Sequence, residues 1–182
     1  MAGHPYRMRL LRTLAFFTFS CALAAPQNSS PSPVLPSVTA YALDRGKVTL
    51  PADFRSPLNM LILSFQRDQQ SAVDGWFAVL GAAAPGVQTW LLPISPRENV
   101  LYRWWLNASL RGSQPASQPR HYTVPLYVNK GEFLHSLQVT SEQEIVLLLT
   151  DKAGHVLWRT GGPINDSKKA GLNSFLMKSP AR

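Results

Sequence analysis

Residues 60–84 read MLILSFQRDQQSAVDGWFAVLGAAA, and this stretch decides the fold. It begins with Met60 to Phe65, a continuous apolar run of strand length, which is typical of a strand buried on both faces of a sheet. The segment from Ser71 to Ala84 follows it. Its apolar residues recur at the spacing of one helix face: Val73, Trp76, Phe77, Leu80 and Ala84. A buried strand followed by an amphipathic helix predicts an α/β protein with helices above and below the sheet.

The flanking residues extend this alternation of strands and helices. Val48 to Leu50 is a short β-rich piece before the buried strand, and Val87 to Ile94 is a second predicted strand after the helix. Tyr122 to Val128 is predicted as an edge strand, because Pro125 cannot donate a hydrogen bond to a central ladder. Gly131 to Leu137 is predicted as a short helix.

The last third of the chain predicts a hairpin and a helix. Ile145 to Thr150 is a second fully buried strand, and the turn Asp151 to Gly154 joins it to His155 to Arg159. A cap at Asn165 or Asp166 then begins an amphipathic helix with Leu172, Phe175 and Leu176 on its apolar side. The elements together predict an α/β fold in three layers, with a mixed central sheet ending in a β-hairpin and a helix.

Ser95 and Pro96 carry a helix-start signature. Ser95 is placed as the cap, Pro96 as the first helical residue, and Glu98 completes a capping box. The predicted helix would present Leu101, Trp104, Trp105 and Ala108 on one face.

The first 40 residues have the composition of a leader and a linker. Residues 1–24 combine a basic start, a short apolar run and the small-residue site Ala22-Leu23-Ala24, which indicates a secretory signal peptide. Residues 25–40 are rich in Pro and Ser and are predicted as a linker, so the folded domain is expected at 41–178. An exported location, periplasmic or secreted, follows. A mitochondrial leader and lipid attachment at Cys21 are the alternatives.

Charge and motifs exclude several classes of function. The formal net charge of +8 includes three arginines of the leader, and the remaining basic residues are scattered, so nucleic-acid binding is not predicted. A mildly basic exported protein is compatible with peripheral association at anionic membrane surfaces. The histidines show no close ligand pair, and no nucleotide or nucleophile motif is present. Hence no metal, cofactor or catalytic residue is predicted.

Two segments resemble the thioredoxin-like superfamily, particularly its exported thiol-oxidoreductase and peroxiredoxin-type branches. Val124 to Phe133 resembles the strand and turn before a small helix in that family, and Leu147 to Arg159 resembles its terminal hairpin. The chain also resembles the mitochondrial ATP-synthase assembly factor family, which lacks the active-site thiols. The resemblance to the superfamily implies a thioredoxin-like fold. The resemblance to the assembly factor family implies a role in assembly.

Both catalytic signatures of the superfamily are missing. The family places a reactive cysteine after the first buried strand, where Gln66 to Ala72 here contains no thiol. Its cis-proline position corresponds to Ile145, where a trans bond is expected because a non-proline cis bond costs about 3 to 4 kcal/mol. The single cysteine, Cys21, lies in the leader.

The sequence therefore predicts a non-catalytic protein that acts by binding an unidentified protein partner, with assembly of an envelope or membrane complex as one role. The alternative is a thiol-disulfide oxidoreductase or peroxidase, which the absence of a thiol disfavours. The candidate interface residues are Gln66, Arg67, Asp68, Gln69, Gln70 and Arg103. Locally paired charges in a solvated loop are the competing interpretation of the first five, and the oligomeric state stays open.

Overall fold

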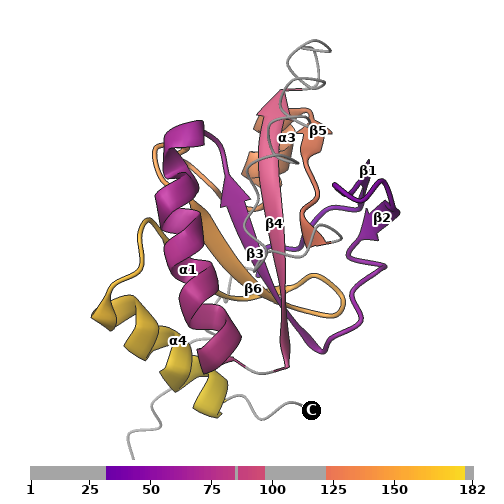
Figure 1. The fold of residues 1–182 in the computed structure, drawn as a ribbon. Helices are drawn as coiled ribbons and strands as arrows, with labels where there is room; N and C mark the ends of the chain where they lie inside the picture. Colours follow the sequence, from indigo (N-terminus) through magenta and orange to yellow (C-terminus); the bar gives the residue numbers. More distant parts are fainter. Residues whose placement is uncertain (1–31, 85, 97–121, 179–182) are drawn as a thin grey trace, which may run out of the picture. The chain divides into compact units, whose positions relative to one another are not determined.

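The described part of the chain is built on a five-stranded mixed sheet. In the computed structural model the described residues are 32–84, 86–96 and 122–178. The sheet has the strand order β5-β4-β3-β6-β7, with β3 parallel to β4, β4 parallel to β5, and β6 antiparallel to both β3 and β7 (Figure 1). The strands are β3 (Leu58–Ser64), β4 (Val87–Pro96), β5 (Leu126–Val128), β6 (Val146–Asp151) and β7 (Val156–Gly161). This topology confirms the predicted mixed sheet and its closing hairpin.

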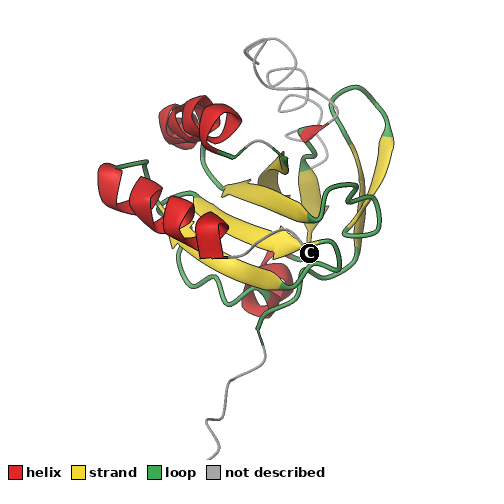
Figure 2. Cartoon of the chain, turned by 90° about the horizontal axis from the view of Figure 1, so that it is seen from below, coloured by secondary structure: helices red, strands yellow, loops and turns green. Residues whose placement is uncertain are grey.

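Helices cover both faces of this sheet, as Figure 2 shows. They are η1 (Arg67–Gln69), α1 (Gln70–Ala83), α3 (Lys130–Ser136) and α4 (Asp166–Lys178). Met60 and Ile62 of β3 pack in one cluster with residues of α1 and α4, while Leu61 and Leu63 pack in the other with residues of α3. All four side chains are fully buried, which explains why the strand is apolar without alternation. No helix in the described residues is both long enough and apolar enough to cross a membrane.

The folded part begins nearer the N-terminus than the predicted boundary at Tyr41. Leu35 is only 2% exposed, and its backbone N–H donates to the carbonyl of Gly154. A two-stranded antiparallel sheet follows, formed by β1 (Val38–Tyr41) and β2 (Lys47–Leu50). The proline-rich composition does not indicate this packing, because proline has no N–H to donate. The carbonyl of Pro33 nevertheless accepts a hydrogen bond from the backbone N–H of Val156.

The predicted helix start at Ser95 is wrong. Strand β4 continues through Pro96, because β5 lies beside it and extends the parallel ladder with Ser95 opposite Tyr127 and Pro96 opposite Val128. Ser95 is 4% exposed within the sheet and is not a helix cap. Glu98 and the predicted tryptophan-bearing helix lie outside the described residues.

The C-terminal hairpin and helix start as predicted. Asn165 caps α4, because its Oδ1 accepts a hydrogen bond from the backbone N–H of Lys168 at 2.9 Å. In the hairpin turn, Asp151 Oδ1 accepts from the backbone N–H groups of Ala153 and His155, and Asp151 Oδ2 lies 2.8 Å from His155 Nδ1. Burial raises the pKa of Asp151, but the hydrogen bonds and charge of His155 outweigh it and lower that pKa below its usual value. These contacts explain the Asp151–His155 pair as a structural turn.

Candidate functional site

The candidate interface loop lies where β3 ends and α1 begins. Phe65 and Gln66 follow β3 directly, and the next three residues form η1, which leads into α1 at Gln70. Gln66, Arg67, Asp68 and Gln70 are exposed, as a contact surface requires. Gln69 is only 7% exposed. The five predicted residues therefore divide into four surface residues and one buried residue.

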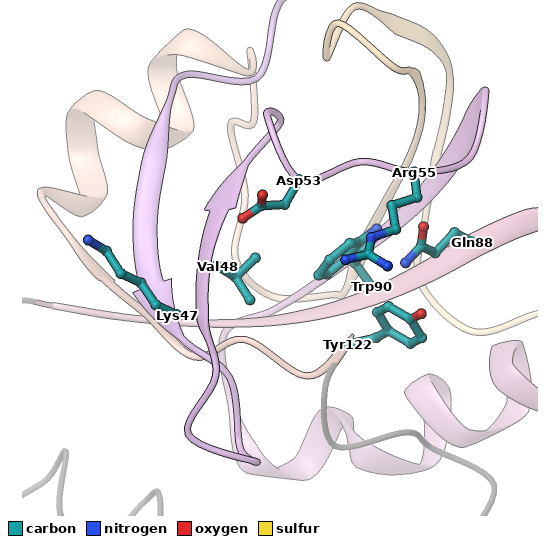
Figure 3. A pocket seen from close by; sticks show the side chains of 7 residues that line it. All are labelled: Lys47, Val48, Asp53, Arg55, Gln88, Trp90 and Tyr122. Carbon is teal, nitrogen blue, oxygen red and sulfur yellow. The ribbon is translucent and has the colours of Figure 1, made fainter.

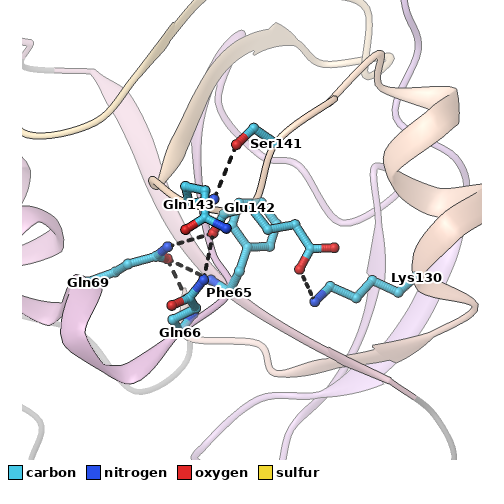
Figure 4. Close-up of polar contacts among 7 residues, drawn as sticks. All are labelled: Phe65, Gln66, Gln69, Lys130, Ser141, Glu142 and Gln143. Atoms are coloured by element: carbon cyan, nitrogen blue, oxygen red, sulfur yellow. Dashed lines mark hydrogen bonds and ion pairs between the residues drawn. The ribbon is translucent and has the colours of Figure 1, made fainter.

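Gln69 connects this loop to a segment that lies far away in the sequence (Figure 4). Its side-chain Oε1 accepts hydrogen bonds from the backbone N–H of Phe65 at 2.8 Å and of Gln66 at 3.3 Å. Its Nε2 donates to the backbone carbonyl of Glu142 at 2.9 Å, and Gln66 Nε2 donates to the same carbonyl at 3.3 Å. The amide of Gln69 thus pairs with part-buried backbone groups on both sides and holds the start of α1 against the loop before β6.

A third segment joins this network through Lys130, the first residue of α3. The ammonium group of Lys130 forms an ion pair with the carboxylate of Glu142, and its Nζ lies 5.8 Å from the centre of the Phe65 ring. The Glu142 side chain is 39% exposed, so solvent screens the ion pair. The cluster of Phe65, Gln66, Gln69, Lys130 and Glu142, here called the carboxyl-end cluster, connects three segments of the chain at the carboxyl end of β3.

A groove of about 490 Å³ opens beside Glu142. One wall is the segment from Val139 to Val146, and the other is the end of β7 from Arg159 to Gly161. Its lining combines apolar residues with polar ones, among them Gln143, Glu144 and Thr160. A groove of this kind can hold a polar or extended polypeptide segment by hydrogen bonding.

The remaining predicted site residues fall into two cases. Gln70 Nε2 donates to Asp74 Oδ1 at 2.9 Å, so its amide is engaged along α1. Arg103 lies outside the described residues. No local pattern indicates the structural role of Gln69, because its partner Glu142 is 73 residues away.

The chemistry available at the start of α1 is that of amides and charged groups. No thiol occurs among residues 66–72. The bond before Ile145 is not among the cis peptide bonds of the described residues, which accords with the trans bond expected there. Within the described ranges, no group of three or more His, Cys, Asp or Glu residues is placed to hold a metal ion.

Comparison with solved structures identifies the fold. The thioredoxin domain of a thiol-disulfide oxidoreductase from Bacteroides vulgatus matches with a TM-score of 0.55 and 16% identity, covering 81% of this chain and 98% of that one. The exposed lipoprotein thioredoxin Etrx1 of Streptococcus pneumoniae matches with a TM-score of 0.56 and 11% identity, over 79% and 100% of the two chains. BsSco, a member of the Sco family of cytochrome c oxidase assembly proteins, matches with a TM-score of 0.55 and 14% identity, over 82% and 97%.

No family model and no curated protein matches this sequence. The identities to the solved structures are low, so these similarities establish architecture rather than activity. The strand order, the helices on both faces and the terminal hairpin agree with that architecture. The chain has the thioredoxin-like fold.

Proposed function

We propose that the chain is an exported, non-catalytic thioredoxin-fold protein that acts by binding a protein partner. The contact surface is the exposed part of the loop after β3, formed by Gln66, Arg67 and Asp68, together with the adjoining groove. Assembly of an envelope or membrane complex is the role that we assign to it. One of the similar structures, BsSco, belongs to a family of assembly proteins, which supports this class of role.

The main observation behind the proposal is that Gln69 is buried and hydrogen-bonded at the start of the helix. A thiol enzyme of this fold needs a reactive sulfur near the start of the helix. Here this position has no cysteine, and a buried amide bonded to two loops occupies it. Such an arrangement supports a rigid recognition surface rather than a redox centre.

Export rests on the leader and on one comparison. The first 24 residues have the charge, apolar run and small-residue site of a signal peptide. One similar structure is that of an exposed lipoprotein. Both features support a location outside the cytoplasm, where a binding protein of this type would meet membrane complexes.

We expect the purified chain to lack disulfide reductase and thiol peroxidase activity. The only cysteine is Cys21, which the leader would carry away, and these reactions require a thiolate. Insulin reduction and peroxide consumption measure the two activities, with the Cys21→Ser variant as control. Turnover that persists in Cys21→Ser would contradict the non-catalytic assignment.

The double substitution Arg67→Ala and Asp68→Ala tests the contact surface. We expect capture of the partner from the membrane fraction to fall by about tenfold, since charged side chains at the centre of an interface commonly contribute 1 to 2 kcal/mol or more. Stability should change by less than about 0.5 kcal/mol because both residues are exposed. Quantitative pull-down and urea unfolding are the measurements.

A matched control removes one charge of each sign elsewhere. Asp166→Ala with Lys169→Ala does so on α4, whose residues are not part of the carboxyl-end cluster. Partner capture should be retained in this variant. Equal capture by both double variants would place the interface away from the loop after β3.

A further inference from the structure

A second pocket lies at the opposite end of the sheet from the carboxyl-end cluster. Its volume is about 380 Å³. Arg55 precedes β3, and Gln88 and Trp90 belong to the first half of β4, so these residues mark the amino ends of the two central strands. The pocket is therefore separate from the surface proposed above.

Side chains from several segments converge in this pocket (Figure 3). The guanidinium of Arg55, the amide of Gln88 and the ring of Tyr122 lie around Trp90, whereas the ammonium of Lys47 points away from them. Trp90 is 1% exposed and forms the floor, with its ring centre 5.1 Å from that of Tyr122 in an edge-to-face arrangement. Tyr122 is half-buried and offers the more accessible ring.

Trp90, the floor of the pocket, is held in place by a hydrogen bond and by aromatic packing. Trp90 Nε1 donates to Oδ1 of Asn59 at 3.4 Å, and Asn59 Nδ2 donates to the carbonyl of Ser56 at 2.9 Å. Asn59 is fully buried, and Phe54 packs against Trp90 with ring centres 5.7 Å apart. A floor fixed in this way is preorganised, which lowers the entropy cost of binding a ligand.

The charges around the pocket are not balanced within it. Asp53 is its one acidic residue, and Asp53 Oδ2 already accepts a hydrogen bond from the backbone N–H of Thr49 at 2.6 Å. Among the described residues, the side chains of Arg55 and Gln88 have neither an ion pair nor a hydrogen bond. A guanidinium with vacant donors beside an amide and an aromatic ring recognises an oxyanion attached to an apolar group.

We propose that this pocket binds a small organic anion, with a carboxylate or phosphate held by Arg55 and Gln88 and an aromatic ring packed against Tyr122. The two oxyanions share the chemistry that Arg55 recognises. The bidentate geometry of the guanidinium suits either of them. The aromatic part distinguishes such a ligand from a free inorganic ion.

Titration of the full chain with benzoate and with phenyl phosphate tests the proposal, with benzyl alcohol as the uncharged probe. The indole N–H resonances report the location, because Trp90 lies under the pocket while Trp76 donates to Gly162 within the other core cluster. We expect at least one of the two anions to shift the Trp90 resonance and leave that of Trp76 in place. The tighter anion of the two identifies the preferred head group.

Two arginine variants distinguish binding in the pocket from non-specific attraction of the anion to positive charge. Arg55→Gln should weaken binding of the preferred anion about tenfold, the loss expected for one charge-assisted contact. Arg45→Gln removes the same charge from an exposed position that does not line the pocket, and its affinity should match that of the unchanged chain. An unaltered affinity in a folded Arg55→Gln variant, equal binding of benzyl alcohol, or no response of Trp90 to either anion would overturn the proposal.

Discussion

Replacement of Trp76 by alanine is expected to lower the free energy of unfolding by about 3 to 5 kcal/mol, the range for removing a large buried aromatic side chain. Trp76 is fully buried on the face of the sheet that α1 and α4 cover. Its Nε1 also donates to the carbonyl of Gly162 at 2.9 Å, which connects α1 to the residue after β7. Domains of this size are stable by about 5 to 15 kcal/mol, so the variant should lose a large part of its stability.

Two further substitutions separate packing from hydrogen bonding. Trp76→Phe keeps an aromatic ring but leaves the Gly162 carbonyl without its donor, which should cost about 1 to 3 kcal/mol. Phe77→Ala, at the neighbouring half-buried position, should cost less than Trp76→Ala. Urea unfolding followed by far-ultraviolet circular dichroism avoids the change in tryptophan fluorescence. A loss below about 1 kcal/mol in Trp76→Ala would show that α1 does not depend on this anchor.

The central elements were predictable because each carries its own local pattern. Within the run Met60 to Phe65, the residues that pack against helices on either face of the sheet are all apolar. The helix α1 begins and ends within one residue of its predicted bounds. The turn Asp151 to Gly154 also follows from turn chemistry, since aspartate and glycine meet its backbone requirements. Local periodicity and turn residues were sufficient for these elements.

The misplaced elements depend on partners that local sequence does not specify. Ser95 and Pro96 carry a helix-start signature, yet pairing with Tyr127 and Val128 keeps both residues in β4. Residues 25–40 have linker composition, but Leu35 enters the core and Val38 begins a strand. Tertiary contacts override the local preference in both cases.

The site was predictable in position but not in construction. The place of Gln66 to Gln70 follows from the end of a buried strand and the start of a helix. Nothing in the sequence separates Gln69 from its four polar neighbours in this stretch, since the Glu142 carbonyl becomes its partner only in the folded chain. The pocket at Arg55 was missed for the same reason, because its walls come from segments scattered along the chain.

Replacement of Gln69 by alanine is expected to destabilise the protein by about 1 to 3 kcal/mol, because it removes the side-chain acceptor of the part-buried Phe65 N–H and one of the two side-chain donors to the Glu142 carbonyl. Gln70→Ala, which removes an exposed amide from the next position, should change stability by less than about 0.5 kcal/mol. Urea unfolding of both variants measures the difference. Equal stability of the two would mean that water replaces the contacts of Gln69.

Gln69→Glu tests the donor side of the same network. A carboxylate can still accept from the backbone N–H of Phe65, but it cannot donate to the carbonyl of Glu142 and repels it. Protonation restores one donor, so the folded variant should bind a proton more tightly than its unfolded chain does. Its stability relative to the unchanged protein should therefore rise as pH falls through the acidic range. Parallel pH dependence of both proteins would show that Glu142 does not need the donor. Recovery of both stability and partner capture at low pH would show that partner binding depends on the ordered loop that Gln69 maintains.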